Sequence, residues 1–202
     1  AESRSTTFGA ATMAVLQLHN LELGAAVLGD SGFMVLRQGA AGLEIIARSK
    51  EQQHGFNFPY QLMKLPPALL AKTKKDWKSD SAADCKIYSM PVQPGDLVLA
   101  FSDGFVDNLE DSAILRIVDD FLGNACSNAC PRSHHGIDRC SCELEVNPSL
   151  LAEELCLAAH AQSINPDVEV PFGVTARAHG YKHVGGKQDD ITVAAAWVVE
   201  IQ

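Results

Sequence analysis

The sequence lacks any apolar run close to the roughly 20 residues that a helix needs to cross a bilayer, which argues against a membrane-spanning segment. Basic residues are also in the minority, because 16 Lys and Arg stand against 25 Asp and Glu, for a net charge of −9. This balance argues against nucleic acid or an anionic membrane as the main partner. Two explanations of this charge are equally good: a soluble acidic surface, or a metal site that would use part of the charge.

Cysteine is sparse as well, since six residues in a chain of 202 are too few for a disulfide scaffold. Cys85 and Cys156 lie in strand-like and helix-like patterns, as buried free thiols do, so a reducing, intracellular compartment is favoured. No targeting segment is visible, but there is no initiator Met either, and the chain enters an apolar strand almost at once. We therefore expect that the N-terminus is trimmed or incomplete.

The chain is 47% hydrophobic and 20% charged, as in a globular domain of ordinary size. Strand-like runs cluster at both ends and helices follow in a block, which predicts an α+β fold rather than alternating βαβ units. The expected strands cover residues 6–18, 21–28, 33–37, 43–48, 86–91, 97–101 and 191–201. The expected helices cover residues 110–122 and 147–161, the first ended by Gly123 and the second capped by Asn147. The expected irregular segments are an ordered loop with a short helical turn at 51–68, a surface connection at 72–84 and residues 165–183.

Residues 124–146 differ in character, because they hold four of the six cysteines and two adjacent histidines between the two expected helices. Cys126 and Cys130 have the spacing of a pair of zinc ligands. Cys140 and Cys142 are too close together for such a pair. An inserted loop with incidental cysteines is therefore favoured over a zinc site.

Three acidic turns follow or precede apolar runs, at residues 28–32 (LGDSG), 97–108 (LVLAFSDGFVDN) and 185–190 (GGKQDD). Carboxylates on several strand ends, without clustered thiols or histidines, suit Mg²⁺ or Mn²⁺. Two such cations can orient a water molecule for in-line attack on phosphorus. Acidic loops that merely end strands are the alternative. A cation for the phosphate is not obvious, since Arg37 is the one arginine that flanks these turns.

These three motifs, in this order, resemble the C-terminal motifs of the metal-dependent (PPM) protein phosphatases, type 2C. Residues 5–7 (STT) resemble the small-residue motif that opens a core strand in that family. Residues 51–62 (EQQHGFNFPYQL) resemble the signature of a subgroup that includes mitochondrial phosphatases. The resemblance extends over nearly the whole chain. It implies an antiparallel β-sandwich flanked by helices, in four layers (αββα).

The resemblance also implies roles for particular residues. Asp103 and Asp189 would bind the catalytic metal pair, and Asp30 and Asp107 match acidic positions that hold a weaker third metal together with Asp103. Three residues would take supporting roles: Gly104, Gly186 and Asp190, the last at a position where the family usually has Asn. Two alternatives stay open, because Asp107 also suits the N-terminus of the following helix and Asp30 a plain turn.

The chain departs from the family in lacking its N-terminal third, which supplies a phosphate-binding Arg, an acidic ligand and an Asp-Gly motif. We therefore expect residues 1–202 to be the C-terminal portion of a single phosphatase domain, cut from a longer protein rather than degenerate. Alone, it should bind Mn²⁺ poorly and turn over little p-nitrophenyl phosphate.

The implied function is hydrolysis of phosphoserine and phosphothreonine in proteins by a metal-activated water, with two or three Mg²⁺ or Mn²⁺ ions and a phosphoprotein substrate. Alternatives are a non-catalytic pseudophosphatase or protein-binding module of the same fold, and a sporulation-type regulatory phosphatase. A mitochondrial location would follow from the subgroup alone. The oligomeric state stays open.

Overall fold

The computed structural model describes residues 6–70, 80–129 and 147–200. The chain divides into two compact units. The first unit comprises Ala1–Gly32 and Ser49–Pro91, and the second comprises Phe33–Arg48 and Val92–Gln202. Most of the expected Cys/His loop, residues 130–146, lies outside the described residues. The first part of that segment, up to Ala129, continues a helix instead.

The first unit contains a three-stranded antiparallel sheet in the order β2-β3-β9. Its strands are β2 (Met13–His19), β3 (Glu22–Leu28) and β9 (Lys86–Pro91). Two smaller antiparallel pairs complete it: β1 (Gly9–Ala11) with β8 (Leu62–Lys64), and β6 (Gln53–Gly55) with β7 (Phe58–Pro59). The single strand expected over residues 6–18 is therefore two strands, because β1 pairs with β8 and β2 with β3.

The prediction of a loop at residues 51–68 is only partly correct. The short helical turn is present as α1 (Pro67–Leu70), but β6, β7 and β8 also fall in this range. A strand of two or three residues has no readable period and forms through its partner, so the local pattern could not predict it. The following connection contains a 3₁₀ turn, η2 (Ala82–Asp84), whose N-terminus is capped by Ser81.

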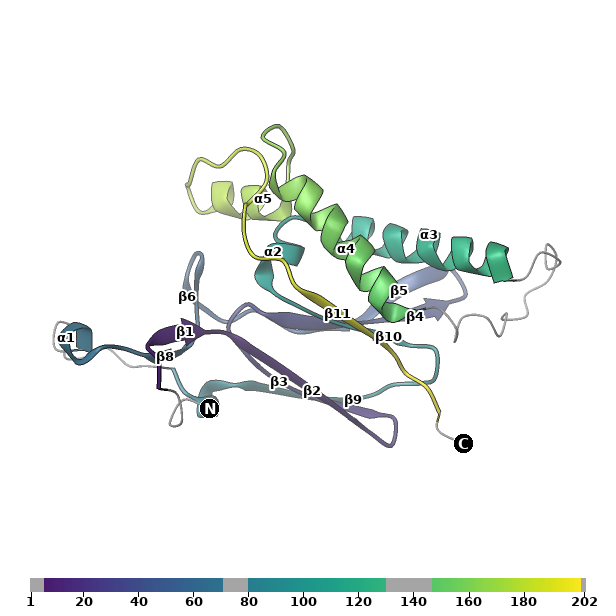
Figure 1. Cartoon of the computed structure of the whole chain (residues 1–202), viewed down its shortest axis with the longest axis horizontal. Helices are drawn as coiled ribbons and strands as arrows, with labels where there is room; N and C mark the ends of the chain where they lie inside the picture. Colours follow the sequence, from purple (N-terminus) through teal and green to yellow (C-terminus); the bar gives the residue numbers. More distant parts are fainter. Residues whose placement is uncertain (1–5, 71–79, 130–146, 201–202) are drawn as a thin grey trace. The chain divides into compact units, whose positions relative to one another are not determined.

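The second unit is built on a four-stranded sheet in the order β11-β10-β4-β5. Its strands are β4 (Gly32–Gly39), β5 (Gly42–Arg48), β10 (Leu97–Phe101) and β11 (Val193–Trp197). The last strand is shorter than the expected range 191–201. Two long helices, α3 (Asp111–Ala129) and α4 (Pro148–Ser163), lie over one face of this sheet (Figure 1). The core of this unit fills the space between the two helices and the sheet.

This core is apolar and almost fully buried. Its members come from β4, β10, the α2 region, α3 and α4: Met34, Leu36, Leu97, Leu99, Phe101, Phe105, Val106, Leu109, Ile114, Val118, Leu151, Leu155 and Ala159. Ile114 and Val118 are fully buried, so α3 packs an apolar face into this core. Leu97, Leu99 and Phe101 alternate with half-buried neighbours, so β10 is buried on one face and half-buried on the other.

The two long helices extend beyond their expected ends. Gly123 does not end α3, because glycine inside a helix costs only about 1 kcal/mol relative to alanine, and packing of the apolar face can offset this. The expected start of α4 is confirmed, since the Asn147 side chain accepts a hydrogen bond from the Ser149 N–H at 2.9 Å. Two short helices were not expected: α2 (Asp103–Val106) and α5 (Pro171–Ala178).

The mixed α+β class is confirmed, and the four-layer sandwich stays a prediction. Among the described residues no helix combines the length and the apolar character that crossing a bilayer requires. Cys85 and Cys156 are free thiols, as expected, although both are half-buried rather than buried.

Candidate functional site

Three of the predicted acidic residues meet at one point in the second unit. The Nζ atom of Lys187 lies 2.7 Å from Oδ2 of Asp103, 2.6 Å from Oδ2 of Asp107 and 3.0 Å from Oδ2 of Asp189. Asp103 and Asp107 stand at the two ends of α2, while Asp189 follows from a loop more than eighty residues later. We call the three aspartates the carboxylate cluster.

The short helix α2 presents its two acidic side chains because β10 ends directly before it. Ser102 fixes this junction, since its hydroxyl donates to the Asp190 carbonyl at 2.9 Å and accepts the Thr192 N–H at 3.0 Å. Gly104 permits the backbone at Asp190 to lie close to α2. A Cβ atom there would lie 2.6 Å from the Asp190 carbonyl oxygen. The expected supporting role of Gly104 thus has a steric reason.

The loop at residues 185–190 is held by two further residues. Gly186 packs against the end of α4, and a Cβ atom there would lie 2.0 Å from the Gln162 carbonyl oxygen. Asn108, only 2% exposed, accepts the Lys187 N–H and donates to the Lys187 carbonyl, both at 2.9 Å. Its amide also donates to the Gly104 carbonyl at 2.9 Å. Asn108 therefore joins α2 to the loop that carries Lys187 and Asp189.

The electrostatics of the cluster are dominated by the Lys187 ion pairs. Burial by itself lowers the pKa of Lys187, but hydrogen bonds from its ammonium to the three carboxylates raise this pKa above its ordinary value. Burial likewise raises the pKa of Asp189, while the Lys187 ammonium and the Asp190 N–H lower it, and the result is a pKa below the ordinary value. Both groups therefore stay charged at neutral pH.

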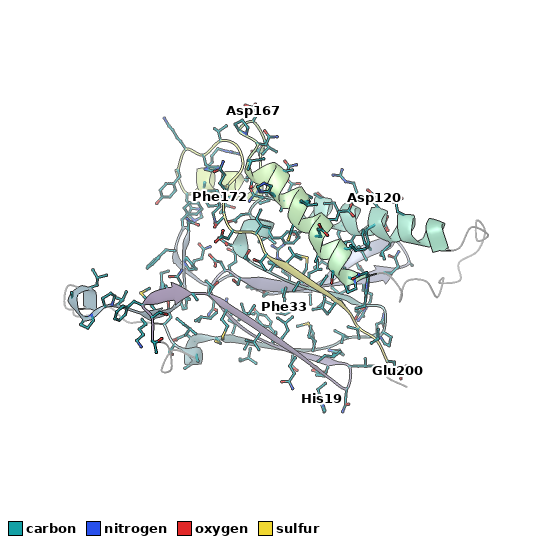
Figure 2. The ribbon with its side chains drawn as sticks, in the orientation of Figure 1. His19, Phe33, Asp120, Asp167, Phe172 and Glu200 are labelled. Carbon is teal, nitrogen blue, oxygen red and sulfur yellow. The ribbon has the colours of Figure 1, made fainter. Side chains whose placement is uncertain are left out.

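An aromatic ring completes the surroundings of the ammonium. Nζ of Lys187 lies 4.8 Å from the centre of the Phe172 ring, within the range of a cation–π contact. Phe172 stands at the start of α5 (Figure 2), where its N–H donates to the Asp107 carbonyl at 3.0 Å. The unexpected helix α5 thus contributes directly to the site.

The remaining predicted residues have different surroundings. Asp190 contributes to the site through its backbone. Its N–H donates to the Asp189 carboxylate at 2.9 Å, and its carbonyl accepts from the Ser102 hydroxyl. Asp30 belongs to the first unit, where it is 7% exposed, and its part in a third metal site stays a prediction. The Asp107 carboxylate binds Lys187 four residues before α3 begins at Asp111, so the structure gives it a role beyond that of a helix N-terminus.

The turn that contains Asp30 is fixed by Gln52, a member of the 51–62 signature. The Gln52 N–H donates to the Gly29 carbonyl at 2.9 Å, and the Gly29 N–H donates back to the Gln52 side chain at 3.3 Å. The Gln52 amide also donates to the Asp84 carbonyl at 2.8 Å. In this structure Gln52 therefore acts as a link between three segments of the first unit.

Replacing Gln52 with alanine should lower the free energy of unfolding by about 2 kcal/mol, because the buried Gly29 N–H loses its acceptor and the Asp84 carbonyl loses its donor. Urea unfolding followed by circular dichroism measures this loss. Gln17→Ala is the matched control, since Gln17 is exposed on β2 and its replacement should cost no more than about 0.5 kcal/mol. Equal losses in the two variants would contradict the role of Gln52.

Lys187, Asn108 and Phe172 are the site residues that sequence reasoning missed. Lys187 lies in the motif at residues 185–190 and Asn108 in the motif at residues 97–108, and these two motifs are the sequence signal that could have identified them. A cation does lie at the acidic turns, but it is Lys187, whose ammonium pairs with the three carboxylates, and the cation for the phosphate stays unassigned. Arg37 instead forms two 2.7 Å hydrogen bonds with Asp96.

The donor set of the cluster fits a hard divalent cation in its chemistry, because all three acidic side chains offer carboxylate oxygens and approach one point. In their present arrangement, the described residues include no group of three His, Cys, Asp or Glu side chains spaced to hold a metal ion. The ammonium of Lys187 stands where the carboxylates converge, and it has the charge sign of a metal ion.

A pocket of about 290 Å³ adjoins Asp189 on the side of α4. Its lining includes Glu153, Cys156 and His160 from one face of that helix, together with Asp189 and Asp190. Burial raises the pKa of the Cys156 thiol, and the Val193 N–H only partly offsets this. The thiol is therefore protonated at neutral pH, and a nucleophilic role for it is disfavoured.

In comparisons with known proteins, the chain is similar to protein phosphatases. The protein phosphatase PTC7 homolog fig of Drosophila ananassae is 37% identical over 193 residues, which cover 94% of this chain and 50% of that protein. Probable protein phosphatase 2C 55 of Arabidopsis thaliana is 30% identical over 190 residues, covering 94% of this chain and 33% of that protein. The chain thus spans half of one relative and a third of the other.

Among solved structures, the X-ray structure of the photosystem II phosphatase PBCP matches with a TM-score of 0.70 and 25% sequence identity. The match covers 98% of this chain and 68% of that one. No protein-family model matches the chain. The resemblance expected from the motifs is nevertheless confirmed, because relatives and structure agree over nearly the whole sequence. The chain belongs to the type 2C family of protein phosphatases.

Proposed function

We propose that this chain is the C-terminal portion of a metal-dependent phosphatase domain that hydrolyses phosphoserine and phosphothreonine in proteins. The observation that carries the proposal is the convergence of Asp103, Asp107 and Asp189 on one point, although they come from segments far apart in sequence. Acidic loops that merely end strands would have no reason to meet. Membership of the type 2C family supports a phosphoprotein as the substrate.

In this proposal Asp103 and Asp189 bind a pair of Mg²⁺ or Mn²⁺ ions, and Asp107 contributes to a third metal position. When bound, the metal ions would polarise a water molecule and offset the negative charge of the phosphoryl group. The chain's own contribution is to hold the carboxylates rigidly. Ser102 and Asn108 do so through their hydrogen bonds to the 185–192 segment.

The test uses the complete product of the gene that carries this sequence. It should hydrolyse phosphoserine and phosphothreonine peptides only when Mn²⁺ or Mg²⁺ is present. Asp103→Asn or Asp189→Asn should lower kcat/KM by at least about a hundredfold, because loss of an outer-shell partner alone costs 10–100-fold and a direct ligand matters more. Phosphate release at saturating and limiting peptide measures the loss.

Asp190→Asn is the matched control, because Asp190 lies next to Asp189 and supports the site through its backbone. It should change kcat/KM by no more than about threefold. Activity that survives chelation, or that Asp103→Asn leaves intact, would contradict the proposal. A folded protein that binds phosphopeptide without turnover would favour the non-catalytic binding module instead.

A further inference from the structure

The ammonium of Lys187 is held in place by the groups around it. Its side chain is only 12% exposed, and its charge is placed between three carboxylates and the face of Phe172. Lysine on a protein surface normally keeps its ammonium in water. Here the group has exchanged that hydration for ion pairs.

The backbone beneath this side chain is also fixed. Asn108 binds both the N–H and the carbonyl of Lys187 at 2.9 Å, and Gly186 anchors the preceding residue against α4. The Cα atom of Lys187 is thus held in relation to α2, so the ammonium reaches the cluster from a defined origin. The four-carbon stem remains flexible and can turn away without a change in the backbone.

A divalent cation and this ammonium require the same carboxylate oxygens. All three Oδ2 atoms lie within 3.0 Å of Nζ, which leaves no room for a metal ion on those atoms while Lys187 stays in place. The two positive charges would also repel each other strongly at such short range. Metal binding at the cluster therefore has to displace the ammonium.

We propose that Lys187 is an intramolecular competitor for the metal site: it neutralises the carboxylate cluster in the metal-free protein and leaves when a divalent cation binds. This inference rests on the proposed function, because it takes the cluster to be the metal site. The competition multiplies the metal association constant by the fraction of molecules whose ammonium has left the cluster, so the apparent affinity falls as that fraction falls.

The test compares Lys187→Met with the unaltered protein, again as the complete gene product. Mn²⁺ alone is titrated, and free Mn²⁺ is followed by its electron paramagnetic resonance signal, so that no catalytic assay is involved. Lys187→Met should bind Mn²⁺ at least about tenfold more tightly, because its competitor is gone. Lys182→Met removes an exposed lysine of the same loop region and should leave the affinity unchanged.

A second measurement follows unfolding of the metal-free protein in the presence of a chelator. Lys187→Met should lower the unfolding midpoint, since three carboxylates then face one another without a counter-charge, and added salt should restore part of the loss. Unchanged or weaker Mn²⁺ binding by Lys187→Met would overturn this inference while leaving the proposed function intact. No Mn²⁺ binding by either protein would overturn both.

Discussion

Replacing Asp96 with alanine should destabilise the protein by about 3 kcal/mol, which lowers the folding equilibrium constant by more than about a hundredfold. The Asp96 side chain is 1% exposed and accepts two 2.7 Å hydrogen bonds from Arg37 as well as the Gln93 N–H at 2.8 Å. Alanine would leave the Arg37 guanidinium without its bidentate partner. The expected loss lies at the lower end for a buried ion pair, because Arg37 itself remains 28% exposed.

The position of Asp96 explains why this contact matters to the whole second unit. Asp96 ends the Gln93–Asp96 turn before β10, and its backbone carbonyl accepts the Val198 N–H at 2.9 Å just after β11. Arg37 lies on β4. One residue therefore connects three of the four strands that support the carboxylate cluster. The pair also raises the pKa of Arg37, chiefly through its hydrogen bonds with Asp96, against the opposing effect of burial.

Urea unfolding of Asp96→Ala, Arg37→Ala and the double variant measures the pair itself. The double variant should be less destabilised than the sum of the two single variants, because neither charge then remains alone. Asp120→Ala is the control, since Asp120 is exposed on α3 (Figure 2), and its effect should stay within about 0.5 kcal/mol. Additive single effects would show that the two side chains do not act as a pair.

Replacing Gly186 with alanine is the second change with a large expected effect. The new Cβ atom would lie 2.0 Å from the Gln162 carbonyl oxygen and 2.6 Å from two backbone atoms of Ser163. These are backbone atoms of α4, so no side chain can rotate out of the way. We expect a loss of about 3 kcal/mol in the free energy of unfolding, the upper end for overpacking.

The same substitution should also weaken the site. Relief of the contact requires the loop to move away from α4, which shifts Lys187 and Asp189 relative to α2. Mn²⁺ affinity should therefore fall together with stability. Gly123→Ala is a control of opposite sign, because a Cβ atom there meets nothing within 4 Å and alanine favours the helix by up to about 1 kcal/mol. Equal stability of Gly186→Ala and Gly123→Ala would refute the steric argument.

Much of the secondary structure could be predicted from the sequence, and the errors share a cause. The patterns of β3, β4, β5, β9 and β10 and the apolar face of α3 have enough length to show a period. The elements β6, β7, β8, α2 and α5 are short, and each depends on contacts elsewhere in the chain. The predicted end of α3 at Gly123 is wrong, because one glycine is a weak local signal and does not outweigh the packing of the helix.

The candidate site divides in the same way. The acidic residues, their order along the chain and the family could be predicted from the sequence, since these are properties of local motifs. That Asp103, Asp107 and Asp189 meet around the Lys187 ammonium, and that Asn108 fixes the loop beneath it, follows from the three-dimensional packing alone. The physical reason is that a motif specifies which group is present, whereas the distance between two charges eighty residues apart is set by the packing of β10, α2 and α4.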